Sequence, residues 1–127
     1  MGSGAGLPGI ALKIVRPDIQ LTWIESTHKK VTFLEEVIHQ LKLTSTAALC
    51  ERAELAGRMS IHRECYDIAL TRALAEPAPA MELVLPFVSP GCPALFWGSA
   101  SAWGNEAVLN VIAGKLSGKF CGGKSYV

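Results

Sequence analysis

The sequence lacks the features that mark several common classes of protein. It has no C-x-x-C pair, and its four cysteines and three histidines show no metal-like spacing. No run reaches the ~18 apolar residues that a membrane-spanning helix needs. The first residues include neither the basic segment nor the unbroken apolar segment of a secretory signal peptide. These absences predict a cytoplasmic protein with reduced thiols, no metal and no membrane partner.

Charge is also scarce, because charged residues make up 18% of the chain and the net charge is +1. Such a balance gives no basic surface of the kind that nucleic-acid-binding proteins usually carry, so charge alone neither supports nor excludes an RNA substrate. Half of the residues are apolar, which argues against disorder. We expect one folded domain over residues 1–127, present as a monomer.

Glycine, in contrast, is concentrated at one place. Residues 2–9 read GSGAGLPG and lead into the apolar run that starts at Ile10. Glycines permit a tight turn and let a ligand approach the bare backbone. Gly4 to Gly9 match G-x-G-x-x-G, and Glu25 ends the next predicted strand, where a carboxylate accepts hydrogen bonds from ribose hydroxyls. This spacing fits NAD and S-adenosylmethionine equally well.

Downstream of this loop, apolar periodicity predicts strands alternating with helices. The expected helices are 9–16, 27–41, a brief turn near 53–56, 77–87 and about 103–116, and the expected strands are 19–25, 46–50, 66–72 and 94–97. This alternation is typical of βα units on a largely parallel sheet, which binds ligands at the carboxyl ends of its strands. Glu25, the segment 52–54 and Arg72 are therefore expected beside the glycine loop in one crevice.

Several linked motifs in this order resemble one family. They are GSGAGLPGI at 2–10, Arg16-Pro17-Asp18, Glu25-Ser26, the run from Lys29 to Leu34, Arg52-Ala53-Glu54, and Tyr66-Asp67 through Arg72-Ala73. The chain resembles the bacterial small-subunit (16S) ribosomal RNA guanine-N7 methyltransferases, also called glucose-inhibited division protein B, from residue 2 to about residue 91.

The resemblance implies an α/β class I methyltransferase fold of Rossmann-like type, with S-adenosylmethionine as methyl donor and small-subunit ribosomal RNA as substrate. Together with the loop glycines and Glu25, it assigns the cofactor to eight positions: Gly2, Gly4, Gly6, Leu7, Glu25, Ala53, Glu54 and Arg72. Guanine N7 has a lone pair and no proton, so the reaction needs no general base. We therefore expect orientation of the base and the methyl group to dominate catalysis, and we name no catalytic residue.

Some of these residues also have a purely structural interpretation. Glu54 is a favourable charge for a helix N-terminus, and Arg72 has Glu54 and Glu76 as possible ion-pair partners. Lys29 and Lys30 are expected on a solvated helix face. The aromatic residues are expected in the core or, for Trp103, against the last helix; the core set is Trp23, Phe33, Phe96 and Trp97.

The resemblance also predicts gaps in the sheet. The family has a central first strand ahead of the glycine loop, whereas only Met1 precedes the loop here, and the family's last two strands are absent or only begun near Tyr126. We expect an incomplete domain whose sheet divides into two pieces, marginal stability and weak S-adenosylmethionine binding. The alternatives are an inactive fragment of that enzyme and, less favoured, a fragment of a dinucleotide-binding oxidoreductase.

Overall fold

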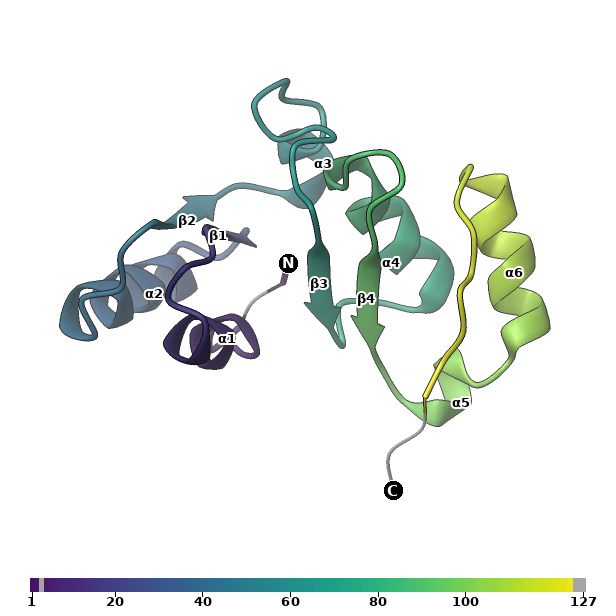
Figure 1. Ribbon diagram of the computed structural model, residues 1–127, viewed down its shortest axis with the longest axis horizontal. Helices are drawn as coiled ribbons and strands as arrows, with labels where there is room; N and C mark the ends of the chain where they lie inside the picture. Colours follow the sequence, from purple (N-terminus) through teal and green to yellow (C-terminus); the bar gives the residue numbers. More distant parts are fainter. Residues whose placement is uncertain (3, 125–127) are drawn as a thin grey trace. The chain divides into compact units, whose positions relative to one another are not determined.

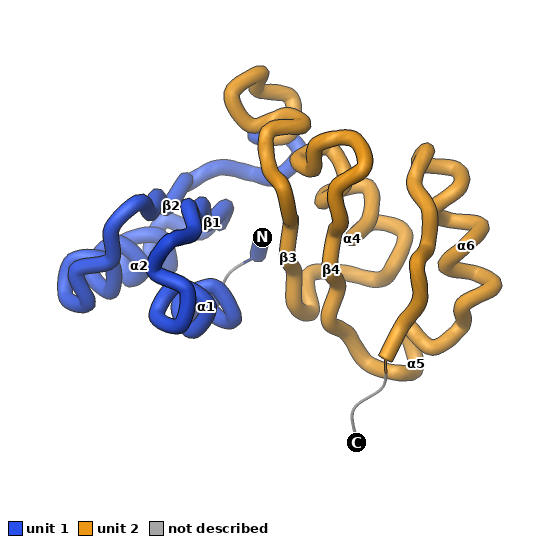
Figure 2. The backbone as a smooth tube through the Cα atoms, viewed as in Figure 1, with its two compact units in different colours: residues 1–56 blue, residues 57–127 orange. Residues whose placement is uncertain are grey.

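The computed structural model describes residues 1, 2 and 4–124. The chain forms two compact units, residues 1–56 and residues 57–127, shown in blue and orange in Figure 2. Each unit has its own pair of parallel strands with helices beside it (Figure 1). The expectation of a single domain stays a prediction.

The first unit follows the predicted order of elements closely. It consists of α1 (Gly9–Val15), β1 (Leu21–Glu25), α2 (His28–Gln40), β2 (Thr46–Cys50) and α3 (Ala53–Ala56). The two strands are parallel, with Leu21 opposite Thr46 and Glu25 opposite Cys50. Helix α2 makes the crossover between them and packs along both strands. The helix and strand predictions in this half are confirmed to within a few residues.

The link between α1 and β1 is fixed by a buried lysine. Pro17 disfavours a helical conformation at the residue before it, and α1 ends at Val15. The Lys13 side chain is only 2% exposed. Its Nζ donates to the carbonyl oxygens of Pro17 at 2.8 Å and Ile19 at 2.5 Å. Lys13 therefore satisfies backbone acceptors that would otherwise be left open between the helix and the strand.

Helix α2 buries one stripe of apolar residues, as its periodicity predicts. Val31 is 5% exposed and Leu34 is fully buried. Phe33 is 48% exposed, so its assignment to the core is wrong. The reason is geometric, because a residue two positions from Val31 and one from Leu34 lies outside the stripe.

The second unit contains the remaining elements. These are β3 (Ala69–Arg72), α4 (Pro77–Val84), a 3₁₀ turn η1 (Leu85–Phe87), β4 (Ala94–Trp97), α5 (Ala100–Trp103) and α6 (Glu106–Lys115). Strands β3 and β4 are parallel, with Ala69 opposite Ala94 and Arg72 opposite Trp97. The alternation of strand and helix again gives a parallel ladder, as predicted.

Three boundaries differ from the sequence prediction. The expected helix 77–87 becomes 3₁₀ at Leu85, since Pro86 has no N–H to donate. The expected strand 66–72 begins at Ala69, with Tyr66 forming only an isolated bridge to Val88. The last helix begins at Glu106 rather than near 103, because the Asn105 side chain caps it and accepts from the Val108 N–H at 3.2 Å.

The core of the second unit lies between its helices and one face of its sheet. Met81, Leu109 and Ala113 are buried together, and Phe96 and Trp103 pack against them. The Phe96 and Trp103 rings stack with centroids 5.0 Å apart, which confirms Trp103 beside the last helix. Trp97 is 43% exposed, and its assignment to the core is wrong. Successive strand residues alternate between faces, so Trp97 lies on the face opposite Phe96.

The described strands form two separate two-stranded sheets, in agreement with the predicted division into two pieces. In β1, the backbone groups of Leu21 and Glu25 bond toward β2, and those of Thr22 and Ile24 therefore face the opposite edge. The Gly2 N–H donates to the Ile24 carbonyl at that edge, at 3.1 Å. The segment 118–124 is not a strand, and the predicted strand near Tyr126 falls outside the described residues.

Among the described residues, no helix has the length and hydropathy to cross a bilayer. Within the same residues, no three histidine, cysteine, aspartate or glutamate side chains are grouped as a metal ion would need.

Candidate functional site

The glycine loop folds into turns that lead directly into α1. Gly2, Gly4 and Gly6 have φ angles of 56°, 51° and 84°, in the left-handed region that favours glycine. A Cβ at Gly6 would also collide with Ile10 and would lie 2.8 Å from Leu34 Cδ2. At Gly4 the same position opens onto free space, with no atom within 4 Å. The loop is thus packed against the side chains of Ile10 and Leu34 at Gly6, and it is open at Gly4.

A tryptophan on β1 holds the loop in this shape. The Trp23 indole is 4% exposed, which confirms it as a core residue, and its Nε1–H donates to the Gly6 carbonyl at 3.3 Å. Gly9 lies flat against the ring, since a Cβ there would be 2.5 Å from Nε1. Sequence reasoning assigned Trp23 only to the core. The third glycine of the motif, Gly9, predicts that its backbone lies close to another part of the chain. The sequence does not show that this neighbour is Trp23.

Glu25 joins the end of β1 to the loop. Its side chain is 6% exposed; Oε2 accepts from the Gly4 N–H at 3.2 Å and Oε1 from the Thr27 N–H at 3.0 Å. Burial by itself raises the pKa of this carboxyl, but the donors at Thr27 and Gly4 outweigh it and the net pKa is lowered. The group is therefore an ionised acceptor. The Thr27 hydroxyl is a further donor to it, and a carboxylate with about four acceptor sites can still accept from a ligand hydroxyl.

The segment after β2 reaches the same end of the sheet. Cys50 lies opposite Glu25, and the Glu51 N–H donates to the Glu25 carbonyl at 3.2 Å. Helix α3 begins at Ala53 and lies against β1. Ala53 is half-buried and Glu54 is exposed in the first turn. Glu54 therefore suits both interpretations, a ligand contact and a charge at a helix N-terminus.

Seven of the eight expected cofactor positions thus belong to the first unit. Around the carboxyl ends of β1 and β2 the structure gathers the loop residues, the buried acid and the start of α3: Gly2, Gly4, Gly6, Leu7, Glu25, Ala53 and Glu54. The Leu7 side chain is 45% exposed and available to a ligand. Lys29 and Lys30 are exposed on α2, as expected for a solvated face.

Arg72, the eighth position, ends β3 in the second unit. Its side chain is exposed, and its partner in register is Trp97. The ion pairs among the described residues join Arg16 to Asp18 and Arg63 to Glu64. Among the described residues of the second unit, no ion pair joins Arg72 to Glu76, and the alternative pairing with Glu54, which lies in the first unit, stays a prediction.

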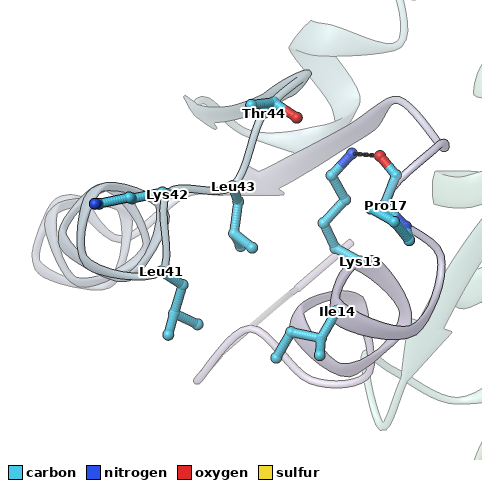
Figure 3. Close-up of a pocket in the computed structure, with 7 residues that line it drawn as sticks. All are labelled: Lys13, Ile14, Pro17, Leu41, Lys42, Leu43 and Thr44. Carbon is cyan, nitrogen blue, oxygen red and sulfur yellow. Dashed lines mark hydrogen bonds between the residues drawn. The ribbon is translucent and has the colours of Figure 1, made fainter.

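A pocket of about 260 Å³ lies elsewhere in the first unit (Figure 3). It is lined mostly by apolar side chains, together with Lys13, Lys42 and Thr44; the apolar ones are Ile14, Pro17, Leu41 and Leu43. The Lys13 ammonium is turned onto the Pro17 carbonyl (Figure 3). Pro17 and Thr44 precede β1 and β2, so this pocket is at the amino ends of the strands, away from Glu25.

Comparison with known proteins agrees with the motifs. A family model described as GidB, rRNA small subunit methyltransferase G, matches residues 1–102. A ribosomal RNA small subunit methyltransferase G of Dictyoglomus thermophilum is 40% identical over 125 residues, which cover 94% of this chain and 51% of that protein. The protein of that name from Desulforamulus reducens is 49% identical over 86 residues, or 68% of this chain and 36% of its own length. The chain spans about half the length, or less, of these curated relatives.

Proposed function

The chain belongs to the GidB family, rRNA small subunit methyltransferase G, a family of class I α/β methyltransferases, and from this premise we propose that it transfers a methyl group from S-adenosylmethionine to N7 of a guanine in small-subunit ribosomal RNA. Its place of action is then the cytoplasm, where that RNA is made. The observation that carries the proposal is the buried Glu25 carboxylate bound to the N–H of Gly4.

The residues of the first unit suit this cofactor. Its ribose has two neighbouring hydroxyls, and Glu25 offers an ionised acceptor at the end of a parallel strand. The open side of Gly4 leaves room for a ligand against the backbone, while Leu7 and Ala53 supply apolar surface for a purine ring. Glu54 adds an acceptor at the start of α3.

The chemistry explains why no acid–base pair is required. The cofactor supplies an electrophilic methyl group, and guanine N7 supplies an unprotonated lone pair. The protein then has to hold the two in line and keep water out, which is the contribution that positioning makes to catalysis. A chain without a general base at its site is consistent with this reaction.

We also propose that the class I sheet includes a strand ahead of the glycine loop, pairing with β1 at the edge formed by Thr22 and Ile24. The Gly2–Ile24 hydrogen bond supports it, because it runs in the direction that a parallel neighbour of β1 would use. On this proposal both units of the chain belong to one methyltransferase domain.

Calorimetric titration with S-adenosylmethionine tests the site. We expect weak one-to-one binding, and Glu25→Ala should weaken it about 10- to 100-fold, the usual loss for a charged hydrogen bond. The exposed Glu35, changed to Gln, is the matched control and should bind like the parent. Equal binding by the Glu25 variant contradicts the assignment, and tight binding by the parent contradicts the expected weakness.

Labelled methyl transfer to deproteinised ribosomal RNA, followed by detection of 7-methylguanine, tests the activity. Cofactor binding without transfer favours the inactive-fragment alternative. Displacement of the cofactor by NAD at lower concentration favours the oxidoreductase alternative and overturns the proposal.

A further inference from the structure

The pocket at the amino ends of β1 and β2 has no part in the function proposed above. It lies wholly within the first unit, between α1 and the segment that links α2 to β2. Glu25 ends β1 at the opposite end of the same sheet. A ligand in this pocket therefore leaves the candidate cofactor site free and needs no contribution from the second unit.

The polar group of this pocket is a buried cation. The Lys13 side chain is 2% exposed, and its ammonium donates to the carbonyls of Pro17 and Ile19. An ammonium has three N–H donors, so one remains after these two bonds. No carboxylate of the described residues forms an ion pair with Lys13, and Asp18, the acid nearest to it in sequence, is paired with Arg16 at 2.6 Å. Because a buried charge is costly without a partner of opposite sign, the Lys13 ammonium favours an anion beside it.

One wall of the pocket is set by the way α2 ends. The Lys42 N–H donates to the His39 carbonyl at 3.2 Å, and Lys42 has a left-handed φ of 50°. The Leu43 N–H donates to the Ile38 carbonyl at 2.9 Å. These two bonds form a Schellman motif, which fixes the direction in which the chain leaves the helix. Leu43 therefore lines the pocket from a fixed backbone, while the Lys42 ammonium points away from it (Figure 3).

The remaining lining favours a small apolar body. Ile14 and Leu41 line the pocket with 58% and 49% of their surface exposed, and Leu43 between them is half-buried. A ligand body placed against these side chains removes their apolar surface from water. The pocket volume of about 260 Å³ is below the ~300–1,000 Å³ of sites for drug-sized ligands, so the occupant is small.

The donors at the pocket favour a carboxylate over a phosphate. Phosphate sites commonly gather several backbone N–H groups at a helix N-terminus or in a nest. Here the N–H groups of Lys42 and Leu43 are already taken by the end of α2. The side-chain donors that remain are the Lys13 ammonium and the Thr44 hydroxyl. Two donors match the two oxygens of a carboxylate.

We propose that this pocket binds a small organic carboxylate, with its charged end on the Lys13 ammonium and its apolar body between Ile14 and Leu43. Helix α1 follows the glycine loop directly, so an occupied pocket connects this helix to the segment between α2 and β2. The site stands independently of the methyl-transfer reaction, because none of its residues is assigned to the cofactor.

NMR titration of the ¹³C- and ¹⁵N-labelled full chain with sodium benzoate tests the proposal. We expect the Lys13 ε-methylene and the Ile14 and Leu43 methyl resonances to shift saturably in the millimolar range. Benzamide has the same shape without the charge, and it should bind about 10-fold or more weakly, the loss of a charge-assisted hydrogen bond. Acetate has the charge without the ring and should also bind more weakly than benzoate.

Each probe can contradict one part of the inference. Equal binding of benzamide contradicts the role of the Lys13 charge, and equal binding of acetate contradicts the apolar contacts. Tighter binding of inorganic phosphate than of benzoate contradicts the assignment of a carboxylate. Displacement of benzoate by S-adenosylmethionine contradicts a separate site, and resonances that ignore benzoate overturn the whole proposal.

A matched pair of variants on α1 locates the site. Ile14→Glu places a negative charge at the pocket and should abolish the benzoate shifts. Val15→Glu adds the same charge at a residue that is 76% exposed and outside the lining, and it should leave binding unchanged. Equal losses in the two variants overturn the location. Lys13→Met should bind benzoate no better than benzamide, and the benzamide comparison in the parent chain tests the same charge without relying on the folding of this variant.

Discussion

At the scale of single residues, Glu25 is the group whose ionisation matters most to the site. Two backbone N–H donors hold the pKa of this buried carboxyl below its ordinary value of 4.5. A lowered native pKa means that ionised Glu25 stabilises the folded chain above the unfolded-state pKa. That stability is lost as the pH falls through the native pKa.

We therefore expect Glu25→Gln to cost roughly 1.5–3 kcal/mol of unfolding free energy at pH 7, the range for hydrogen bonds to a charged group. The difference from the parent should shrink as the pH falls below about 4.5 toward the lowered native pKa. Urea unfolding of both proteins from pH 7 to pH 3 measures it. A difference that does not change with pH contradicts the role given to the ionised form.

The loop glycines offer a matched pair of substitutions. Gly6→Ala places a Cβ against Ile10 and Leu34 and also forces alanine into a φ of +84°. Gly4→Ala has no such steric contact, and its only cost is the φ of +51°. We expect roughly 1–2 kcal/mol of destabilisation at Gly4, from the left-handed backbone alone, and a clearly larger loss at Gly6. Thermal unfolding of the two variants gives the comparison, and equal losses contradict the packing described for Gly6.

The sequence could predict part of the site at this scale. Gly4 and Glu25 are visible as motif residues, and the structure places them in hydrogen-bond contact. The N–H of Thr27 and the indole of Trp23 complete the arrangement, but neither carries a motif. A backbone donor has no side-chain signature, and an indole in a strand has the same pattern as any core residue. The assignment of Arg72 to the cofactor stays a prediction.

At the scale of elements, α6 shows how one side chain sets a boundary. The side-chain Oδ1 of Asn105 accepts from the Val108 N–H, and this capping starts the helix three residues after Trp103. Replacement of Asn105 by alanine should destabilise the second unit by about 0.5–2 kcal/mol. The exposed Asn110 inside α6 is the control, since alanine favours a helix interior and Asn110→Ala should be neutral or slightly stabilising. Chemical denaturation that shows the same loss in both variants contradicts the cap.

Elements with a clear period were predictable, and the exceptions have either a local cause or a cause in strand pairing. The stripe of α2 was sufficient to predict that helix, while Phe33 beside the stripe was misplaced because hydrophobicity alone does not say which face a residue takes. Trp97 was misplaced for the same reason in β4, where the apolar run Ala94–Trp97 hides the alternation of faces. The shorter β3 reflects pairing with β4, which no local pattern predicts.

At the scale of the whole molecule, the two sheets have separate ladders and the second unit has its own core around Leu109. We expect Leu109→Ala, at a residue 2% exposed, to destabilise that unit by about 2–5 kcal/mol. Hydrogen exchange should then show lost protection in β3 and α6, with the amides of β1 and β2 unchanged. Equal loss in both units contradicts independent units and supports a single cooperative domain.

The contact between Gly9 and Trp23 has a consequence for how such a chain changes over generations. A side chain at position 9 is sterically excluded for as long as the indole occupies position 23. Once position 23 carries a smaller residue, the constraint on position 9 disappears, and the order in which the two substitutions arise decides which lineage keeps a working loop. The pair should therefore show epistasis of magnitude: Gly9→Ala is harmful alone and tolerated after Trp23→Leu.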